Sequence, residues 1–172
     1  QPFVDEWRGN TSIYGCGLSP DRTQLSVGEM VVALPDGNQV GQGPPDLRSC
    51  YAWTEQGMVY QAKGDGRNDY WLWDGSKRTP LPESAGSLRS DGFGLHSRSR
   101  GTCDEVVRLT QEDEVVVVRE FCAHDLRSLS PDARLVLTVE DDVLDVATGK
   151  VVGSIDRPAD FAAVYPEDIL WE

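Results

Sequence analysis

The sequence predicts an all-β fold assembled from repeated modules of short antiparallel strands. The first observation is a four-residue signal, Leu-Ser-Pro-Asp at 18–21 and 129–132, with related quartets at 52–55, 95–98 and 164–167. The third positions of these quartets lie 34, 43, 34 and 35 residues apart, a period typical of repeat architectures. The second observation is that 17 Gly and 10 Pro are scattered along the 172 residues, which favours many tight turns.

The repeat that follows residue 125 shows the module most clearly. Its runs of β-branched residues are too short for typical helices, and turn signals such as Pro131-Asp132 and Thr148-Gly149 separate them. We expect four strands in one antiparallel meander, at Ser128–Ser130, Leu135–Val139, Val143–Val146 and Val151–Ile155.

The first repeat matches this one in phase, because Asp21 and Gly37 are 16 residues apart and Asp132 and Gly149 are 17 apart. The third repeat departs from the pattern, since its quartet lacks Pro and Asp and a fourth strand is hard to place. The remaining strands are expected at 24–27, 30–34, 38–40, 51–53, 58–62 and 70–73, with extra residues of the second repeat in 63–69 and in a loop over 79–91.

These signals predict a single domain of four repeats plus part of a fifth. A meander of this size has too little core to stand alone, so each repeat must stack on its neighbours. The repeats are expected at about 14–48, 49–90, 91–125 and 126–160, with the partial one at 161–172.

The pattern resembles β-propeller blades of the WD-repeat and TolB-like kind. The resemblance lies in Leu129–Leu135 with Asp145–Val152, and in Ala52–Tyr60 with Leu72–Gly75. In that family a Ser-Pro-Asp-Gly turn joins the two innermost strands of a blade, and Asp-Gly or Thr-Gly joins the outer two. The resemblance covers roughly residues 14–172 and implies a propeller-like array of four-stranded blades in a secreted bacterial protein of the actinobacterial type.

The number of repeats leaves three arrangements open. Propellers have about 4–8 blades and usually close by pairing both termini in one blade. The chain is therefore a fragment of a larger propeller, a small ring with an irregular last blade, or a sheet completed by a partner chain. Phe3–Trp7 is a candidate closing strand, whereas Ile169–Trp171 ends in the middle of a blade.

The net charge of −13, from 29 acidic and 16 basic residues, argues against nucleic acid and anionic membranes as partners. Basic proteins, cations and neutral ligands remain. No apolar run approaches the roughly 18 residues that a membrane-spanning helix needs, and no basic flank precedes an apolar stretch as in a signal peptide.

Four cysteines without a Cys-x-x-Cys pair favour two disulfides over a zinc site. Cys103 and Cys122 flank two strand-like runs whose turn lies midway between them, so they face each other in a hairpin. Cys16 and Cys50 hold equivalent places in adjacent repeats and form the second expected pair. Disulfides imply an oxidising compartment, and we expect a secreted or envelope-exposed protein; four free buried thiols in a cytosolic protein are the alternative.

Candidates for catalysis are few. His96 or His124 with Asp125 and a serine would make a triad, but no Gly-x-Ser-x-Gly elbow occurs. Turn capping or hydrogen bonding between blades explains both histidines. Paired carboxylates perform acid–base chemistry in glycosidases. Here a repeated turn role explains the candidates, which are Glu55, Asp91, Asp132 and Glu167.

Candidates for binding lie in the second and third repeats. Trp53 and Tyr70 belong to an aromatic cluster in which Trp71 and Trp73 share one face of a strand and Tyr70 lies on the other. Trp71 and Trp73 are expected to pack against the next blade. Aromatic side chains at a rim hold sugars or peptides, and Arg98 and Arg100 would bind a carboxylate or phosphate. The loop that carries Asp65, Asn68 and Asp69 offers oxygen ligands for calcium, but the EF-hand spacing is absent and a polar hairpin tip explains the segment better.

The leading hypothesis is a non-enzymatic binding or scaffold module that presents loops to a protein or peptide partner, with acidic turns steering basic partners. No cofactor is expected. One alternative is a propeller glycoside hydrolase or lyase, which requires converging carboxylates and a raised pKa. The other is a segment that completes a larger propeller with another chain.

Overall fold

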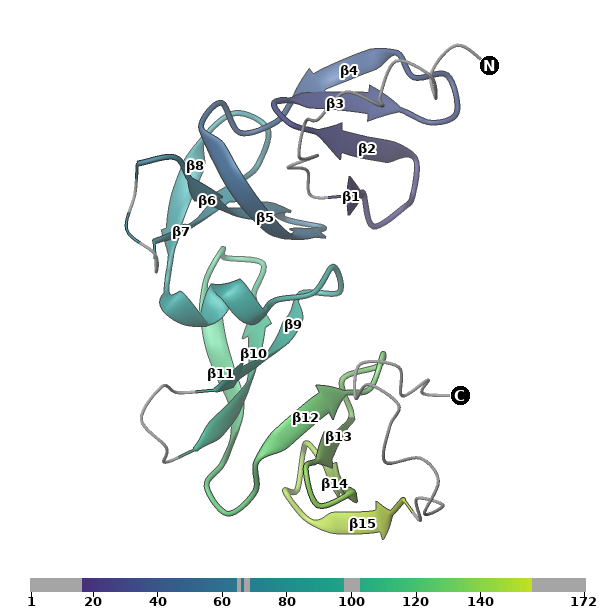
Figure 1. The fold of residues 1–172 in the computed structure, drawn as a ribbon, viewed down its shortest axis with the longest axis vertical. Coiled ribbons are helices and arrows are strands. Elements are labelled where there is room, and N and C mark those ends of the chain that lie inside the picture. The colour runs from purple at the N-terminus through teal and green to yellow at the C-terminus, as the bar shows by residue number, and fades with distance from the viewer. Residues whose placement is uncertain (1–16, 65, 67–68, 98–102, 156–172) are drawn as a thin grey trace. The chain divides into compact units, whose positions relative to one another are not determined.

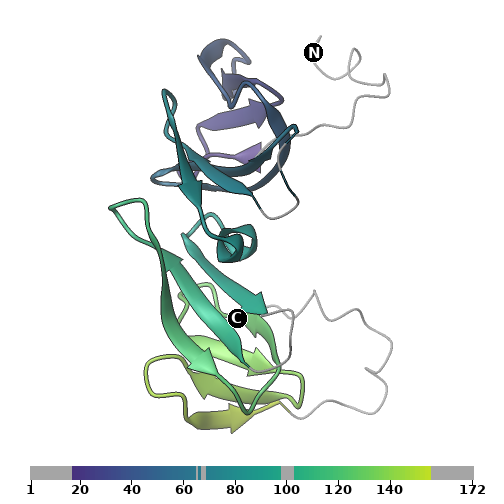
Figure 2. The same ribbon diagram turned by 90° about the vertical axis from the view of Figure 1, so that its left-hand side faces the viewer.

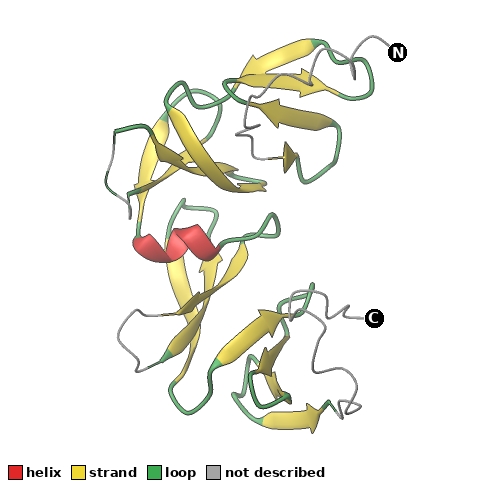
Figure 3. Ribbon diagram, viewed as in Figure 1, coloured by secondary structure: helices red, strands yellow, loops and turns green. Residues whose placement is uncertain are grey.

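A computed structural model describes residues 17–64, 66, 69–97 and 103–155 (Figure 1). These residues form β-strands and turns together with one short 3-10 helix, η2 (Glu83–Ser87) (Figure 3). The chain divides into two compact units. Unit 1 comprises the residues up to Gly92 with Leu109–Val115, and unit 2 comprises Phe93–Arg108 with the residues from Val116 onward.

The strands form four antiparallel sheets, each a meander in chain order, which Figures 1 and 2 show from two sides. The predicted all-β, propeller-like set of blades is therefore confirmed within the described residues. Sheet 1 contains β1 (Gly17–Leu18), β2 (Gln24–Val27), β3 (Met30–Ala33) and β4 (Gln39–Gln42). Sheet 2 contains β5 (Leu47–Thr54), β6 (Gly57–Ala62), β7 (Tyr70–Trp73) and β8 (Arg78–Leu81). Sheet 3 contains β9 (Phe93–Ser97), β10 (Asp104–Leu109) and β11 (Val115–Phe121), and sheet 4 contains β12 (Leu126–Leu129), β13 (Leu135–Thr138), β14 (Asp142–Asp145) and β15 (Val151–Ser154).

Two details differ from the expected strands. β5 begins at Leu47, two residues before the expected start of the second repeat, and runs for eight residues. The segment after residue 78 was expected to be a loop, but it forms the outer strand β8, which pairs with β7 through Trp71 and Pro80. Proline is tolerated there because an edge strand leaves one row of backbone amides unpaired.

The Ser-Pro-Asp turn has the same hydrogen bonds in repeats 1 and 4. The Ser19 hydroxyl donates to Asp21 Oδ1 at 2.6 Å, and the Gln24 amide donates to Ser19 Oγ at 3.0 Å. In repeat 4 the Ser130 hydroxyl donates to Asp132 Oδ1 at 2.7 Å, and the Leu135 amide donates to Ser130 Oγ at 2.9 Å. The motif is thus a self-contained turn that orders the chain between the first two strands of a blade.

The backbone hydrogen bonds of repeats 1 and 4 also match. The Ser19 amide donates to the Gln24 carbonyl, and 111 residues later the Ser130 amide donates to the Leu135 carbonyl, both at 2.9 Å. After the turn between the second and third strands, equivalent residues of the two repeats lie 112 positions apart. The Ala33 amide donates to the Asn38 carbonyl at 2.8 Å, and the Asp145 amide donates to the Lys150 carbonyl at 2.9 Å. The spacing between equivalent residues rises from 111 to 112 because the β13–β14 turn has one residue more than the β2–β3 turn.

The carboxylates of these turns link stability to pH. Hydrogen bonds from Ser130 and the Arg134 amide lower the pKa of Asp132, and bonds from Ser19 and Thr23 do the same for Asp21. A carboxyl whose pKa is depressed by folding stabilises the native state at neutral pH, and this contribution is lost as the pH falls through the depressed pKa.

We therefore expect the urea midpoint of the wild type to fall as the pH is lowered below about 5. The double variant Asp21→Asn, Asp132→Asn keeps an acceptor oxygen at each turn but loses the charge. Its midpoint should be lower at pH 7 and should fall less on acidification. Parallel curves for the two proteins would show that these carboxylates do not contribute.

Sheet 3 lacks an outer strand within the described residues, in agreement with the departure seen in the third repeat. Its strands β10 and β11 form a hairpin, and Cys103 and Cys122 at its open end form the expected disulfide, with Cα atoms 4.0 Å apart. The bond indicates an oxidising compartment. The expected Cys16–Cys50 pair has one end outside the described residues.

The core of unit 2 lies between two blades. Val106 and Phe121 of sheet 3 pack with Leu129, Val136 and Leu144 of sheet 4, and all five side chains are buried. Neither sheet could bury these side chains alone, which is the physical reason why the modules stack.

Candidate functional site

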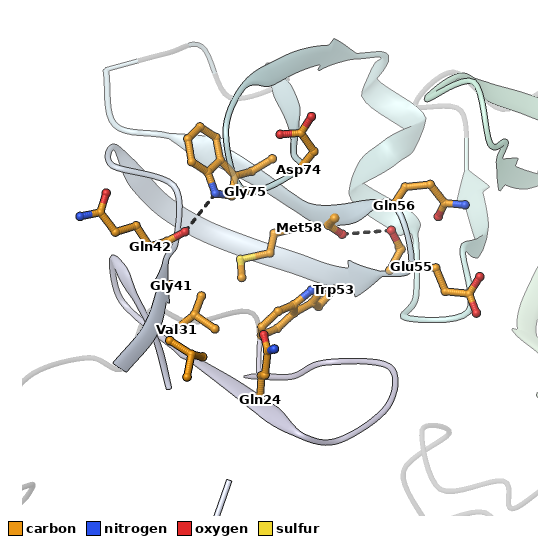
Figure 4. Close-up of a pocket in the computed structure, with 14 residues that line it drawn as sticks. Gln24, Val31, Gly41, Gln42, Trp53, Glu55, Gln56, Met58, Asp74 and Gly75 are labelled. Carbon is orange, nitrogen blue, oxygen red and sulfur yellow. Dashed lines mark hydrogen bonds between the residues drawn. The ribbon is translucent and has the colours of Figure 1, made fainter. Parts of the chain in front are cut away.

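A pocket of about 270 Å³ lies within unit 1, between sheets 1 and 2 (Figure 4). Sheet 1 contributes side chains from β2, β3 and β4, including Gln24, Val31 and Gln42. Sheet 2 contributes Trp53 and Met58 and the two turns that follow β5 and β7. Trp53, a binding residue expected from the sequence, is therefore part of a concave site.

The pocket has an apolar floor. Trp53, Met58 and Trp73 occupy directly paired positions on β5, β6 and β7, so their side chains form one row across the face of sheet 2. Met58 and Val31 are buried, whereas the indole of Trp53 is half-buried. The accessible apolar surface therefore combines the aromatic side chains with Val40 of β4, which is 54% exposed.

The row of aromatic side chains is anchored to sheet 1. The Trp73 indole N–H donates to the Gln42 carbonyl at 3.2 Å (Figure 4). As predicted, Trp71 and Trp73 share a face. The expectation that Trp73 packs against the next blade is wrong, because its indole is hydrogen-bonded to β4 of the preceding blade. A single indole hydrogen bond therefore links β7 to β4 beside the pocket.

A second group of side chains, Arg78, Trp71, Asp46 and Tyr60, forms a connected set of contacts on sheet 2. Arg78 lies 4.2 Å above the ring of Trp71, and its guanidinium binds Asp46 Oδ2 at 2.8 Å. The Tyr60 hydroxyl donates to the other oxygen of Asp46 at 3.2 Å. Burial, and secondarily the Asp46 charge, raise the pKa of Tyr60 to about 12, so the phenol stays protonated and keeps this bond.

The rim of the pocket is polar and acidic. Glu55 and Gln56 lie in the turn between β5 and β6, and Asp74 lies in the turn after β7 (Figure 4). Asp74 Oδ1 accepts hydrogen bonds from the Ser76 amide, the Ser76 hydroxyl and the Lys77 amide, each at 2.9 Å. These bonds lower the pKa of Asp74, so its carboxylate stays ionised. Neither Lys nor Arg is among the residues that line the pocket.

The other expected binding residues lie elsewhere. The Tyr70 ring meets Tyr51 edge-to-face, with centroids 5.1 Å apart, on the side of sheet 2 opposite Trp71. A Cβ on Gly86 would lie 2.4 Å from the Tyr70 hydroxyl, so this ring packs on η2 and is remote from Trp53. Arg98 and Arg100 lie outside the described residues.

The calcium candidates are explained in part by the loop itself. Asp65 and Asn68 lie outside the described residues, and Asp69 Oδ2 accepts the Gly66 amide at 2.8 Å. Within the described part of the chain, potential metal ligands gather at Cys103, Glu120 and Cys122, where the two sulfurs are joined to each other. A disulfide sulfur is not a thiolate ligand.

The catalytic candidates do not converge in the part of the chain that the structure describes. Glu55 lies at the pocket rim, Asp91 pairs with Arg89, and Asp132 holds its turn, while Glu167 lies outside the described residues. His96 lies in β9 opposite Glu105, and His124 in the turn between β11 and β12. Neither histidine hydrogen-bonds a serine or Asp125 among the described residues.

Sequence reasoning missed Met58, Asp74 and the glutamines as parts of the site. Asp74 was identified only as a turn residue, and no pattern in the chain pairs it with Trp53. One signal in the sequence does bear on the site. The alternation of side chains along Tyr70-Trp71-Leu72-Trp73 places Trp73 on the same face of the strand as Trp71.

No protein-family model, curated protein or solved structure matches this chain. Among the described residues, no helix is long and apolar enough to span a bilayer. The arrangement at the pocket, with an aromatic floor, amide and carboxylate groups at the rim and an opening to solvent, is suited to holding a ligand.

Proposed function

We propose that this protein is a non-enzymatic binding module of a secreted or envelope-exposed propeller, and that it docks a protein or peptide at the pocket between sheets 1 and 2. The observation that carries the proposal is the half-buried Trp53 indole over buried Met58, in a concavity with a polar rim. Aromatic anchors in pockets surrounded by polar groups are typical of the centres of binding interfaces.

The carboxylates support binding over catalysis. Asp74 and Asp132 have lowered pKa values because turn amides and hydroxyls hold their charge. A general acid near neutral pH requires the opposite shift. Charged, hydrogen-bonded rim groups orient a partner without transferring a proton.

Peptides selected from a random phage-displayed library on the immobilised chain test this proposal. We expect selected peptides to bind the wild type and to lose affinity at least about tenfold on Trp53→Ala, as for a central aromatic contact. Isothermal titration calorimetry with synthetic peptides measures the change.

The matched control is Tyr51→Ala, which removes an exposed aromatic side chain that contacts Tyr70. It should leave the affinity unchanged, with the fold checked by circular dichroism. Selection of peptides that bind Trp53→Ala as well as the wild type would contradict the proposed site.

A second candidate function, sheet completion by a strand of a partner chain, is favoured by β15. This strand pairs with β14 and is the edge of sheet 4 among the described residues, and Val151 and Val152 are 52% and 59% exposed. Natural edge strands are usually protected by charge or cover. We expect concentration-dependent association in sedimentation velocity, reduced by Val152→Lys and unchanged by Val139→Lys, which replaces a similarly exposed valine outside the strands. A monomer at all concentrations, with no partner strand captured, would remove this candidate.

A further inference from the structure

We propose that the pocket between sheets 1 and 2 receives a basic side chain, arginine or lysine, from the partner peptide. This inference rests on the proposed function and names the chemistry that the site recognises. The aliphatic stem would lie along Trp53 and Met58, and the charged head would reach the carboxylates of the rim.

The pocket is large enough for one long side chain. Its volume is about 270 Å³, at the lower end of the roughly 300–1,000 Å³ of pockets that enclose drug-sized molecules. A long, thin side chain with an apolar stem and a polar end matches a small concavity whose floor is apolar and whose rim is polar.

The charges around the pocket favour a cation. Glu55 and Asp74 contribute two carboxylates, and neither Lys nor Arg lines the pocket; the charge of Lys77, in the turn after β7, acts on Asp74 from outside the lining. Asp74 uses one carboxylate oxygen for the turn, so Oδ2 is left for a ligand. Arg78, on β8 of the same sheet, is paired with Asp46 and lies over Trp71. The overall charge of −13 would also steer basic peptides toward the protein.

The same sheet already contains the kind of contact that we propose. The Arg78 guanidinium stacks on Trp71 at 4.2 Å and binds the Asp46 carboxylate at 2.8 Å. An indole face and a carboxylate are the two groups that hold a cation in cation–π and charge-assisted contacts. In the pocket, Trp53 offers an indole face, and Glu55 and Asp74 offer carboxylates at the rim.

Four peptides of sequence acetyl-Gly-Gly-X-Gly-Gly-amide test the inference, with X as arginine, lysine, citrulline or norleucine. Citrulline keeps the shape of arginine without its charge, and norleucine keeps the stem of lysine. Binding to the full chain is followed by NMR through the indole N–H signals of Trp53 and Trp73. We expect the arginine and lysine peptides to shift these signals and to bind at least about fivefold more tightly than the neutral peptides.

The charge variant is Glu55→Gln, Asp74→Asn, in which the Asn oxygen can still accept the turn hydrogen bonds. It should weaken the arginine peptide about fivefold, as expected for two exposed charge pairs, and leave the norleucine peptide unchanged. The matched control is Glu112→Gln, Glu114→Gln in the exposed β10–β11 turn, which removes the same two charges and should change affinity less than twofold.

The outcomes separate this inference from the proposed function. Equal affinity for arginine and citrulline, or equal loss in both double variants, would overturn the inference, while library peptides that depend on Trp53 would still support the binding module. A response of the Trp53 signal to cello-oligosaccharides together with silence toward all peptides would overturn both.

Discussion

Replacing Gly57 by alanine is expected to disrupt the hairpin that carries the pocket. Gly57 has φ 144°, and a Cβ placed on it would lie 2.2 Å from the Trp73 carbonyl oxygen. Backbone cannot move aside as a flexible side chain does, so β6 and β7 must separate. We expect a loss of about 3 kcal/mol in the free energy of unfolding, measured by urea denaturation, since overpacking adds to the strain of a positive φ.

Gly153→Ala is the matched control for this substitution. Gly153 lies in β15, has no positive φ, and an added Cβ meets no atom within 4 Å. Its stability should stay within about 0.5 kcal/mol of the wild type. A Gly57→Ala protein as stable as Gly153→Ala would show that sheet 2 adapts at this position, and the packing of β6 against β7 would need revision.

The second large effect is expected from removing the disulfide of sheet 3. The variant Cys103→Ser, Cys122→Ser opens a loop with a sequence separation of 19 residues. A cross-link of this length stabilises a protein by about 3 kcal/mol in the chain-entropy account. Sheet 3 has three strands among the described residues, so its hairpin depends more on this cross-link than a four-stranded blade would.

Urea denaturation under non-reducing conditions measures this effect. The slope of free energy against denaturant should rise in the double variant, because the denatured chain becomes less compact without the cross-link. An unchanged midpoint together with an unchanged slope would show that the bond contributes nothing to the fold. The indole signals of Trp53 and Trp73 in unit 1 report whether the pocket survives the change.

The turn hydrogen bonds explain why the repeat was visible in the sequence. In Ser19-Pro20-Asp21 and Ser130-Pro131-Asp132 every side-chain bond reaches only a few residues along the chain. Local interactions of this kind demand particular residue types at fixed spacing, so a reader of the sequence can find them. The outer turns at Gly37 and Gly149, both with φ 71°, are local in the same way.

The disulfide between Cys103 and Cys122 was also accessible, because hairpin symmetry about a single turn determines which residues face each other. β8 was missed, by contrast, because its residues Arg78–Leu81 have weak strand propensity and include a proline. Their extended conformation depends on pairing with β7 and on the ion pair between Arg78 and Asp46.

The chain alone therefore determined the repeated antiparallel modules, their turns and the hairpin disulfide, since each of these depends on contacts close in sequence or on simple alternation. Only the tertiary structure decided that Trp53 belongs with Met58, Asp74, Gln24 and Val31 and that Tyr70 packs away from them. The reason is that the pocket forms where two blades meet. Which side chains meet there depends on register and packing between residues as far apart as Gln42 and Trp73, which no local pattern encodes.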